Sequence, residues 1–219
     1  LEKERLLRCY HGSKKRLLCF DYDVGRSKSL HSTQVSELYL MQGTLSAVKK
    51  MPGSRAPTSA MLKALQSLCN DSRNEVWVIS GRDEATLDKW LGQVKGLGLS
   101  AEHGSFVKYP TSNRWINLLE HFDMSWKHDV VDIFTYYAER TTGSFIEHKR
   151  CSVTWHYRLA DPEYGAFQSK ECQNHLENAI LSKMPVEVLV GKKNLEVRPT
   201  ATNKGEIIKR LLSANQDID

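Results

Sequence analysis

The chain has 219 residues, of which 40% are hydrophobic and 26% charged, a composition typical of a globular protein long enough for one large domain or two small ones. No apolar run approaches the roughly 20 residues that span a bilayer, and the charged N-terminus lacks the apolar core of a secretory signal. The formal net charge is +5, and the excess of basic residues lies near the N-terminus. No aromatic pattern or sequence motif for nucleic-acid binding accompanies these basic residues. The sequence therefore predicts neither a membrane protein nor a nucleic-acid-binding protein.

The first half of the chain alternates predicted strands with predicted helices. The run from Arg16 to Asp23 is apolar and ends in two carboxylates, as expected of a buried parallel strand. A helix is predicted over Pro57 to Asn70, a second strand over Glu75 to Ile79 and a second helix over Asp83 to Leu91. This alternation favours an α/β fold with a parallel sheet, whose ligand sites lie beyond the carboxyl ends of the strands.

The second half is typical of an α+β segment. Helices are predicted over Ser125 to Arg140 and over Pro162 to Leu181. Four alternating runs predict two hairpins, Ser144 to Lys149 with Ser152 to Arg158, and Val186 to Val190 with Asn194 to Arg198. A last helix is expected after Asn203 as N-cap, because Glu206 follows three residues later.

The five cysteines are an odd number and lack the C-x-x-C spacing of a zinc or redox site; they are Cys9, Cys19, Cys69, Cys151 and Cys172. Unpaired cysteines fit a reducing compartment. We therefore expect a cytoplasmic protein in which Cys151 and Cys172 are packing residues. The chain begins without Met, which predicts a fragment of a longer protein.

Polar side chains follow both predicted strands of the first half, and they suit phosphoryl transfer. One carboxylate of the pair Asp21 and Asp23 can attack a phosphoryl group while the other moves a proton, and Mg²⁺ would offset their charge. Ser80 can hold a phosphate oxygen, and Lys204 at a helix start can neutralise the nucleophile and the phosphate. Because D-x-D alone is a weak motif, a solvated turn after a strand is the alternative.

Seven motifs, taken in order, resemble those of one enzyme family. They are L-L-C-F-D-Y-D, V-W-V-I-S-G-R-D, L-G-L-S-A-E-H-G, G-S-F-I-E-H-K, T-W-H-Y-R, N-L-E-V-R-P and N-K-G-E-I-I-K-R-L-L. Their order and spacing are similar to those of trehalose-6-phosphate phosphatases of the haloacid dehalogenase superfamily, particularly the phosphatase domain of the fungal trehalose-synthesis enzymes. The resemblance covers nearly the whole chain outside one insertion.

The resemblance implies a haloacid dehalogenase-like α/β fold, with a three-layer core around a parallel sheet and an inserted α+β cap that binds sugar. The core would comprise residues 1–108 and 200–219, and the cap residues 109–199. An upstream glycosyltransferase-like domain is expected to precede Leu1, and the expected partners are other subunits of a trehalose synthase complex.

The resemblance also implies a role for each matching residue. Asp21 would be the nucleophile and Asp23 the general acid/base, and both would bind Mg²⁺. Thr44, Ser80 and Lys204 would bind the phosphate. The substrate-binding residues would be Arg82, His103, Glu147, Lys149, Arg158, Lys192 and Glu196. The implied reaction is the hydrolysis of trehalose 6-phosphate to trehalose and phosphate through an aspartyl-phosphate intermediate.

The charged cap residues have an alternative interpretation. Charged groups on adjacent hairpins suit the hydroxyls of trehalose, but Glu147, Lys149 and Arg158 could instead form a cross-strand ion-pair ladder on a solvated sheet face. Trp155 is predicted to lie in the cap core, and His156 is predicted to be a structural hydrogen-bonding residue.

The first motif is interrupted. The family reads D-Y-D-G-T-L, whereas 19 residues, Val24 to Gln42, separate Asp23 from Gly43 here. The segment would correspond to a whole number of codons, Val codons begin with GT, and a Gln codon can end in AG. We interpret it as an intron retained in a gene model, with a genuine loop insertion as the alternative.

The sequence also lacks the G-D-D-x-x-D-E-like motif that completes the metal site in the family. Asp21 and Asp23 alone are too few ligands for Mg²⁺ unless waters fill the gap, so the chain as given is expected to be inactive. Part of the sheet beside Arg16 to Tyr22 is expected to be exposed. The alternative function is that of a catalytically inactive, regulatory phosphatase-like subunit of a trehalose synthase complex.

Overall fold

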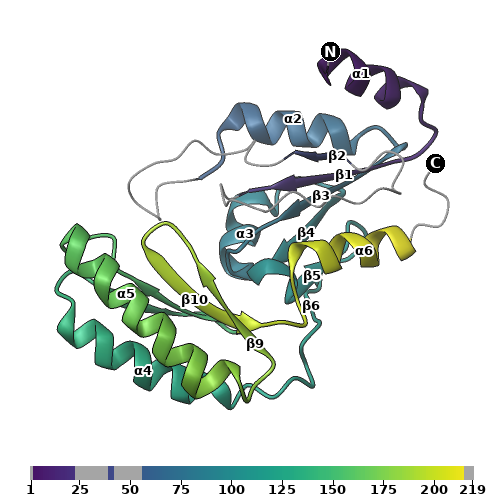
Figure 1. The fold of residues 1–219 in the computed structure, drawn as a ribbon. Helices are drawn as coiled ribbons and strands as arrows, with labels where there is room; N and C mark the ends of the chain where they lie inside the picture. The colour runs from purple at the N-terminus through teal and green to yellow at the C-terminus, as the bar shows by residue number, and fades with distance from the viewer. Residues whose placement is uncertain (1, 23–38, 42–55, 215–219) are drawn as a thin grey trace. The chain divides into compact units, whose positions relative to one another are not determined.

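The computed structural model describes residues 2–22, 39–41 and 56–214 (Figure 1). The chain divides into two compact units, the first formed by Leu1–Leu118 and Asn203–Asp219 and the second by Leu119–Thr202. The second unit therefore begins later than the position near Tyr109 expected for the cap. The reason is that a hairpin of two short strands, β5 (Phe106–Lys108) and β6 (Ile116–Asn117), still extends the sheet of the first unit.

The first unit is built on a six-stranded sheet in the order β2-β1-β3-β4-β5-β6. Its other strands are β1 (Arg16–Asp21), β2 (Tyr39–Met41), β3 (Asn74–Ile79) and β4 (Leu97–Ala101). The predicted parallel arrangement is confirmed for β2, β1, β3 and β4, whereas β5 and β6 join antiparallel. The edge of β1 that was expected to be exposed pairs with β2 along Leu18 to Phe20.

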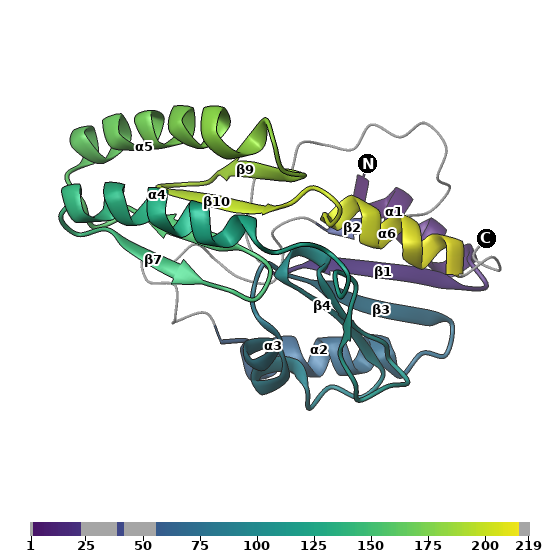
Figure 2. The same cartoon turned by 90° about the horizontal axis from the view of Figure 1, so that it is seen from below.

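Helices lie on both sides of this sheet. Figure 2 shows α6 (Lys204–Ala214) on one side, with α2 (Ser59–Cys69) and α3 (Glu84–Leu91) on the other. Alternate residues of β1 face α6, because Leu17 and Cys19 share a buried cluster with residues of that helix. The layered α/β core predicted from the sequence is therefore confirmed.

Helix starts in the first unit follow the expected capping chemistry. Asp83 accepts a hydrogen bond from the backbone N–H of Thr86 at 2.7 Å and caps α3. Asn203 Oδ1 accepts from the backbone N–H of Glu206 at 3.0 Å, which confirms the predicted N-cap of α6. An additional helix, α1 (Glu2–Gly12), was not predicted from the sequence.

A glycine on β4 is required by the packing of a buried tryptophan. Trp77 on β3 is fully buried and lies opposite Gly98 in the parallel register. A Cβ at Gly98 would lie 2.3 Å from the Trp77 ring, and the ring is also held by an edge contact with Tyr109 and a 2.7 Å hydrogen bond from its Nε1 to Glu75. The Trp77 ring therefore cannot move away to make space for a Cβ at residue 98.

We expect Gly98→Ala to lower the free energy of unfolding by about 1–3 kcal/mol, because overpacking a filled core forces side chains and backbone to shift. Urea denaturation measures the change. Gly12→Ala is the control, since a Cβ there meets nothing within 4 Å, and it should change stability by less than about 0.5 kcal/mol. Equal stability of the two variants would contradict this packing account.

The second unit pairs four antiparallel strands with two helices. The strand order is β7-β8-β10-β9, with β7 (Phe145–His148), β8 (Val153–His156), β9 (Val186–Val190) and β10 (Asn194–Pro199). The helices are α4 (Trp126–Arg140) and α5 (Pro162–Leu176), and α5 continues into a π-helical turn over Glu177–Leu181. Both predicted hairpins and the α+β character of this segment are confirmed.

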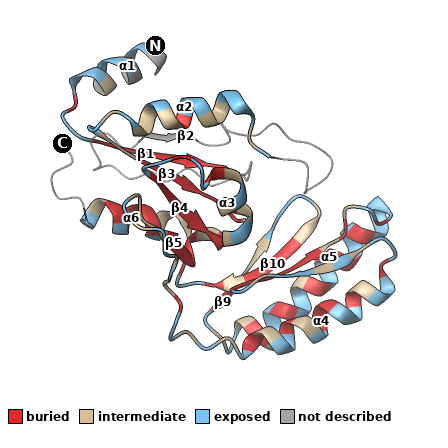
Figure 3. Ribbon diagram, turned by 180° about the vertical axis from the view of Figure 1, so that it is seen from behind, coloured by how far each residue is buried: buried red, intermediate tan, exposed pale blue. Residues whose placement is uncertain are grey.

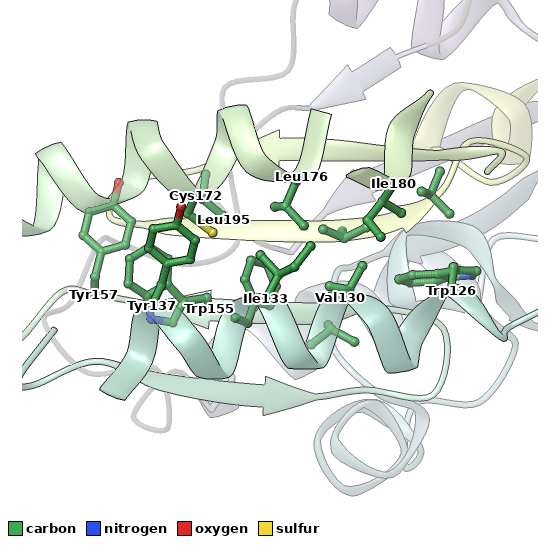
Figure 4. Close-up of a cluster of buried hydrophobic side chains, with 14 of the residues drawn as sticks. Trp126, Val130, Ile133, Tyr137, Trp155, Tyr157, Cys172, Leu176, Ile180 and Leu195 are labelled. Carbon is green, nitrogen blue, oxygen red and sulfur yellow. The ribbon is translucent and has the colours of Figure 1, made fainter. Parts of the chain in front are cut away.

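The core of the second unit lies between its sheet and its two helices. Figure 3 shows the buried stripes of α4 and α5, and Figure 4 shows side chains of both helices meeting those of the strands. The fully buried Trp155 belongs to this cluster, which confirms its predicted place. Residues that alternate with Trp155 along β8, namely Thr154 and His156, lie on the opposite face of the sheet.

The cysteines whose side chains the structure describes carry free thiols: Cys19, Cys69, Cys151 and Cys172. Burial raises the pKa of Cys172 to about 12, so this thiol stays protonated near neutral pH and acts as a packing residue, as predicted. None of the described helices combines the length and the apolar character needed to cross a membrane.

Candidate active site

The parallel register brings Asp21 and Ser80 to adjacent strand ends. Asp21 closes β1 and pairs with Ile79, the last residue of β3, and Ser80 follows directly. Both side chains are buried, Asp21 at 3% exposure and Ser80 at 0%. A buried carboxylate at the carboxyl end of a parallel strand lies where ligands bind in this fold class.

A lysine from the far end of the chain offsets the charge of Asp21. Lys204 is the first residue of α6, and its Nζ lies 2.6 Å from Asp21 Oδ2. Removing one partner of such a pair would leave an uncompensated buried charge. The capped start of α6 therefore places a cation against the carboxylate at the end of β1.

The loop after β3 is held by backbone hydrogen bonds from the loop after β4. Ser80 Oγ accepts from the backbone N–H of Arg82 at 3.1 Å, and the backbone N–H of His103 donates to the Ser80 carbonyl at 2.9 Å. The Arg82 guanidinium carbon lies 4.6 Å from the ring centroid of Trp90 on α3, a cation–π distance. These contacts fix the position of Ser80 and Arg82 beside the end of β3.

Three successive residues after β4 have positive φ values. They are 43° at Glu102, 58° at His103 and 110° at Gly104. Non-glycine residues adopt such values rarely, and strain of this kind clusters at functional sites. The His103 ring lies against Gly81, where a Cβ would be 2.5 Å from Nε2, so the turn brings His103 against the loop after β3.

The predicted metal ligands are only partly described. Asp21 offers a carboxylate oxygen, the donor that Mg²⁺ prefers, whereas Asp23 and Thr44 lie outside the described residues. Within residues 2–22, 39–41 and 56–214, no three His, Cys, Asp or Glu side chains form a group that could hold a metal ion. The described part thus supplies one of the two predicted ligands.

In the second unit, predicted sugar-binding residues gather on the sheet face opposite the helices. Glu196 is buried, and its Oε1 accepts from Ser152 Oγ at 2.9 Å and pairs with Lys149 Nζ at 3.5 Å. Glu147 Oε2 lies 2.7 Å from His156 Nε2. This hydrogen bond lowers the pKa of Glu147, with a further contribution from the charge of Lys149, so Glu147 is ionised at neutral pH.

The remaining two predicted residues lie at the other end of β8. A guanidinium nitrogen of Arg158 donates to the Lys192 carbonyl at 3.3 Å, in the turn between β9 and β10. Because Glu147 pairs with His156 and Arg158 with a backbone carbonyl, these contacts differ from the alternative ladder of Glu147, Lys149 and Arg158. His156 forms a side-chain hydrogen bond, as the sequence predicted.

A match to the trehalose-phosphatase family covers residues 39–219. The chain belongs to the trehalose-phosphatase family. The matched range starts at Tyr39, so Asp21 and Asp23 lie ahead of it, on the other side of the interrupted motif.

Relatives at high identity cover almost the whole chain. A trehalose-phosphatase of Schizosaccharomyces pombe is 49% identical over 214 residues, which are 98% of this chain and 24% of that protein. The solved C-terminal domain of Candida albicans trehalose-6-phosphate phosphatase is 43% identical with a TM-score of 0.84, over 97% of this chain and 66% of that one. The haloacid dehalogenase-like fold is thereby confirmed. The chain spans about a quarter of the length of the curated relatives it matches.

One further solved structure shares the fold at low identity. The C-terminal domain of the Candida albicans trehalose synthase regulatory protein is 20% identical, with a TM-score of 0.72 over 99% of this chain and 67% of that one. The fold alone therefore does not separate the predicted phosphatase from the alternative regulatory subunit.

Proposed function

We propose that the protein containing this chain hydrolyses trehalose 6-phosphate to trehalose and phosphate in trehalose biosynthesis. The observation that carries the proposal is the ion pair of the buried Asp21 with Lys204, 2.6 Å apart at the carboxyl end of β1 and next to Ser80. A carboxylate that attacks a dianionic phosphate needs nearby positive charge. Membership of the trehalose-phosphatase family supports the substrate.

In the proposed reaction, a carboxylate oxygen of Asp21 attacks the phosphorus and the bond between phosphorus and the sugar oxygen breaks. Asp23 gives its proton to that oxygen and then takes a proton from the water that hydrolyses the aspartyl-phosphate. Ser80 and Thr44 would hold phosphate oxygens, and Lys204 would offset the negative charge. Mg²⁺, held by Asp21 and Asp23, would supply further positive charge when bound.

The second unit would recognise the sugar. Its polar sheet face carries an ionised Glu147 and a buried Glu196 bonded to Ser152 and Lys149. Such charged groups form strong, directional hydrogen bonds with sugar hydroxyls. The complete proposed set of substrate-binding residues is Arg82, His103, Glu147, Lys149, Arg158, Lys192 and Glu196.

The alternative is a catalytically inactive regulatory subunit, and the interrupted first motif is the observation that favours it. The retained Asp21, Lys204 and Ser80 support a catalyst instead, because a decayed site should have lost several such residues.

We further propose a cytoplasmic location, since the cysteines whose side chains are described are free thiols. The proposed partners are other subunits of a trehalose synthase complex and an upstream glycosyltransferase-like domain.

The assay protein for these proposals differs from the chain at two places. It lacks Val24 to Gln42, and it continues after Asp219 with the C-terminal segment of the Schizosaccharomyces pombe relative, because the sequence contains no G-D-D-x-x-D-E-like motif. Release of phosphate from trehalose 6-phosphate tests the proposed function. Failure to release it faster than an Asp21→Asn variant would favour the regulatory alternative.

Glu147→Ala should separate sugar recognition from phosphate chemistry. We expect kcat/KM for trehalose 6-phosphate to fall about 10-fold to 100-fold, the effect of losing a hydrogen bond to a charged group, while slow hydrolysis of p-nitrophenyl phosphate changes less than about twofold. His148→Ala, on the same strand but the other face, is the matched control. Equal losses on both substrates would mean that Glu147 supports the fold rather than sugar binding.

A further inference from the structure

Two stacked rings lie beside Glu147 on the sheet face opposite α4 and α5. Phe145 on β7 and His156 on β8 are directly opposed in the antiparallel register. Their ring centroids are 4.8 Å apart and their planes differ by 20°. Glu147 follows Phe145 by two residues along β7, so both side chains lie on one face.

The imidazole of His156 is held from two sides. The Phe145 ring fixes the plane of the imidazole, and the 2.7 Å contact between Nε2 and Glu147 Oε2 fixes the direction of its edge. The contact is diagonal across the strand pair, a separation that long side chains reach. Because Glu147 is ionised and can only accept, Nε2 carries the proton and donates.

The contact with His156 engages only one of the two carboxylate oxygens of Glu147. One carboxylate oxygen, Oε2, accepts from His156, while no residue in the described part of the chain donates to Oε1. The Glu147 side chain is 47% exposed, whereas that of His156 is 18% exposed. The structure thus presents an ionised, half-exposed acceptor with one oxygen anchored.

β7 is an edge strand of its sheet, so a strand flanks Glu147 on one side only. Ordering such a long side chain costs conformational entropy. An anchor that orders it before the ligand arrives removes that cost from binding.

We propose that His156 is a positioning residue for sugar recognition, which holds the Glu147 carboxylate ready to accept from a hydroxyl of the substrate, with Phe145 keeping the imidazole in place. This inference rests on the proposed function, because it assigns a ligand hydroxyl to Glu147. His156 itself donates to Glu147 and does not touch the sugar.

Two substitutions at His156 separate the donor from the ring. His156→Phe keeps an aromatic ring against Phe145 and removes the donor, whereas His156→Gln keeps an N–H of similar reach and loses the ring. The full 219-residue chain is titrated calorimetrically with trehalose 6-phosphate and, separately, with inorganic phosphate. His148→Phe is the matched control on the other face of β7.

We expect His156→Phe to weaken binding of trehalose 6-phosphate about tenfold, as for one lost hydrogen bond to a charged group, and to change inorganic phosphate binding less than about twofold. His156→Gln should remain within about threefold of the unsubstituted chain, because its amide can still donate to Glu147. His148→Phe should change neither affinity by more than about twofold.

A double substitution tests whether His156 acts through Glu147. In a Glu147→Ala background, His156→Phe should change the affinity for trehalose 6-phosphate less than about twofold, since the group that it positions is absent. A tenfold loss that persists in that background, or binding unchanged by His156→Phe alone, would overturn the inference and leave the proposed function standing. An unsubstituted chain that binds trehalose 6-phosphate no more tightly than inorganic phosphate would also overturn the inference, whereas the proposed function is tested separately by phosphate release from the assay protein.

Discussion

Asp21→Asn should abolish hydrolysis of trehalose 6-phosphate by the assay protein, with a loss of at least about 1,000-fold in kcat, as expected when a nucleophile is removed. Asparagine keeps the shape of the side chain but cannot form the aspartyl-phosphate. Asp21 lies at the carboxyl end of β1 with Lys204 at 2.6 Å, so the substitution also removes the charge that Lys204 offsets. Phosphate release at saturating substrate measures the effect.

Two controls accompany this substitution. The urea midpoint of the Asp21→Asn variant shows whether the loss comes from unfolding, since the Lys204 ammonium loses its ionic partner. Excess EDTA should also stop turnover by the parent, because the proposed reaction needs a metal ion to offset the charge of nucleophile and phosphate. Substantial turnover by the folded variant, or an undiminished rate in EDTA, would contradict the assigned chemistry.

Deleting Val24 to Gln42 should raise the rate of trehalose 6-phosphate hydrolysis at least about 100-fold. The comparison is between the assay protein and a version that retains the segment. Thr44 and the backbone N–H groups near Gly43 must reach the phosphate attacked by Asp21, and a displacement of about 1 Å can cost on the order of 100-fold in rate. Initial rates with both proteins measure the effect.

One structural observation favours the opposite outcome. β2 pairs with β1 in parallel, with Met41 opposite Phe20 and therefore one position before Asp21. An inserted loop that leads into such a strand has a route back to the end of β1, and lengthening a loop adds entropy cost only slowly. Equal rates with and without Val24 to Gln42 would show a tolerated loop and would remove the functional support for the retained-intron interpretation.

Regular patterns in the sequence predicted most of the fold. The apolar run of β1 was sufficient because that strand is buried along its whole length, and the helical spacing of α4 was sufficient because its buried residues recur at that spacing. Helix α1 was not predicted, since its first residues are mostly charged. The short β5 and β6 were also missed, because three and two residues carry no period.

The sequence predicted the parts of the site that local pattern determines, but not the contacts that depend on tertiary packing. The strand-end positions of Asp21 and Ser80 follow from local pattern, whereas the contact of Lys204 with Asp21 spans 183 residues of sequence, and its role was inferred from its place at a helix start and from the resemblance to a family. No signal in the sequence indicated the positive φ of Glu102 or the stacking of Arg82 on Trp90. The first depends on how neighbouring loops pack, and the second on how the loop after β3 lies against α3.

The central claim is that Asp21 becomes phosphorylated during hydrolysis of trehalose 6-phosphate. Acid quenching of the assay protein during turnover of substrate carrying radiolabelled phosphate, followed by borohydride reduction and peptide mapping, tests it most directly. We predict label on the protein, reduction of residue 21 to homoserine, and neither in the Asp21→Asn variant. Rapid turnover without labelled protein, or label on another residue, would contradict the account.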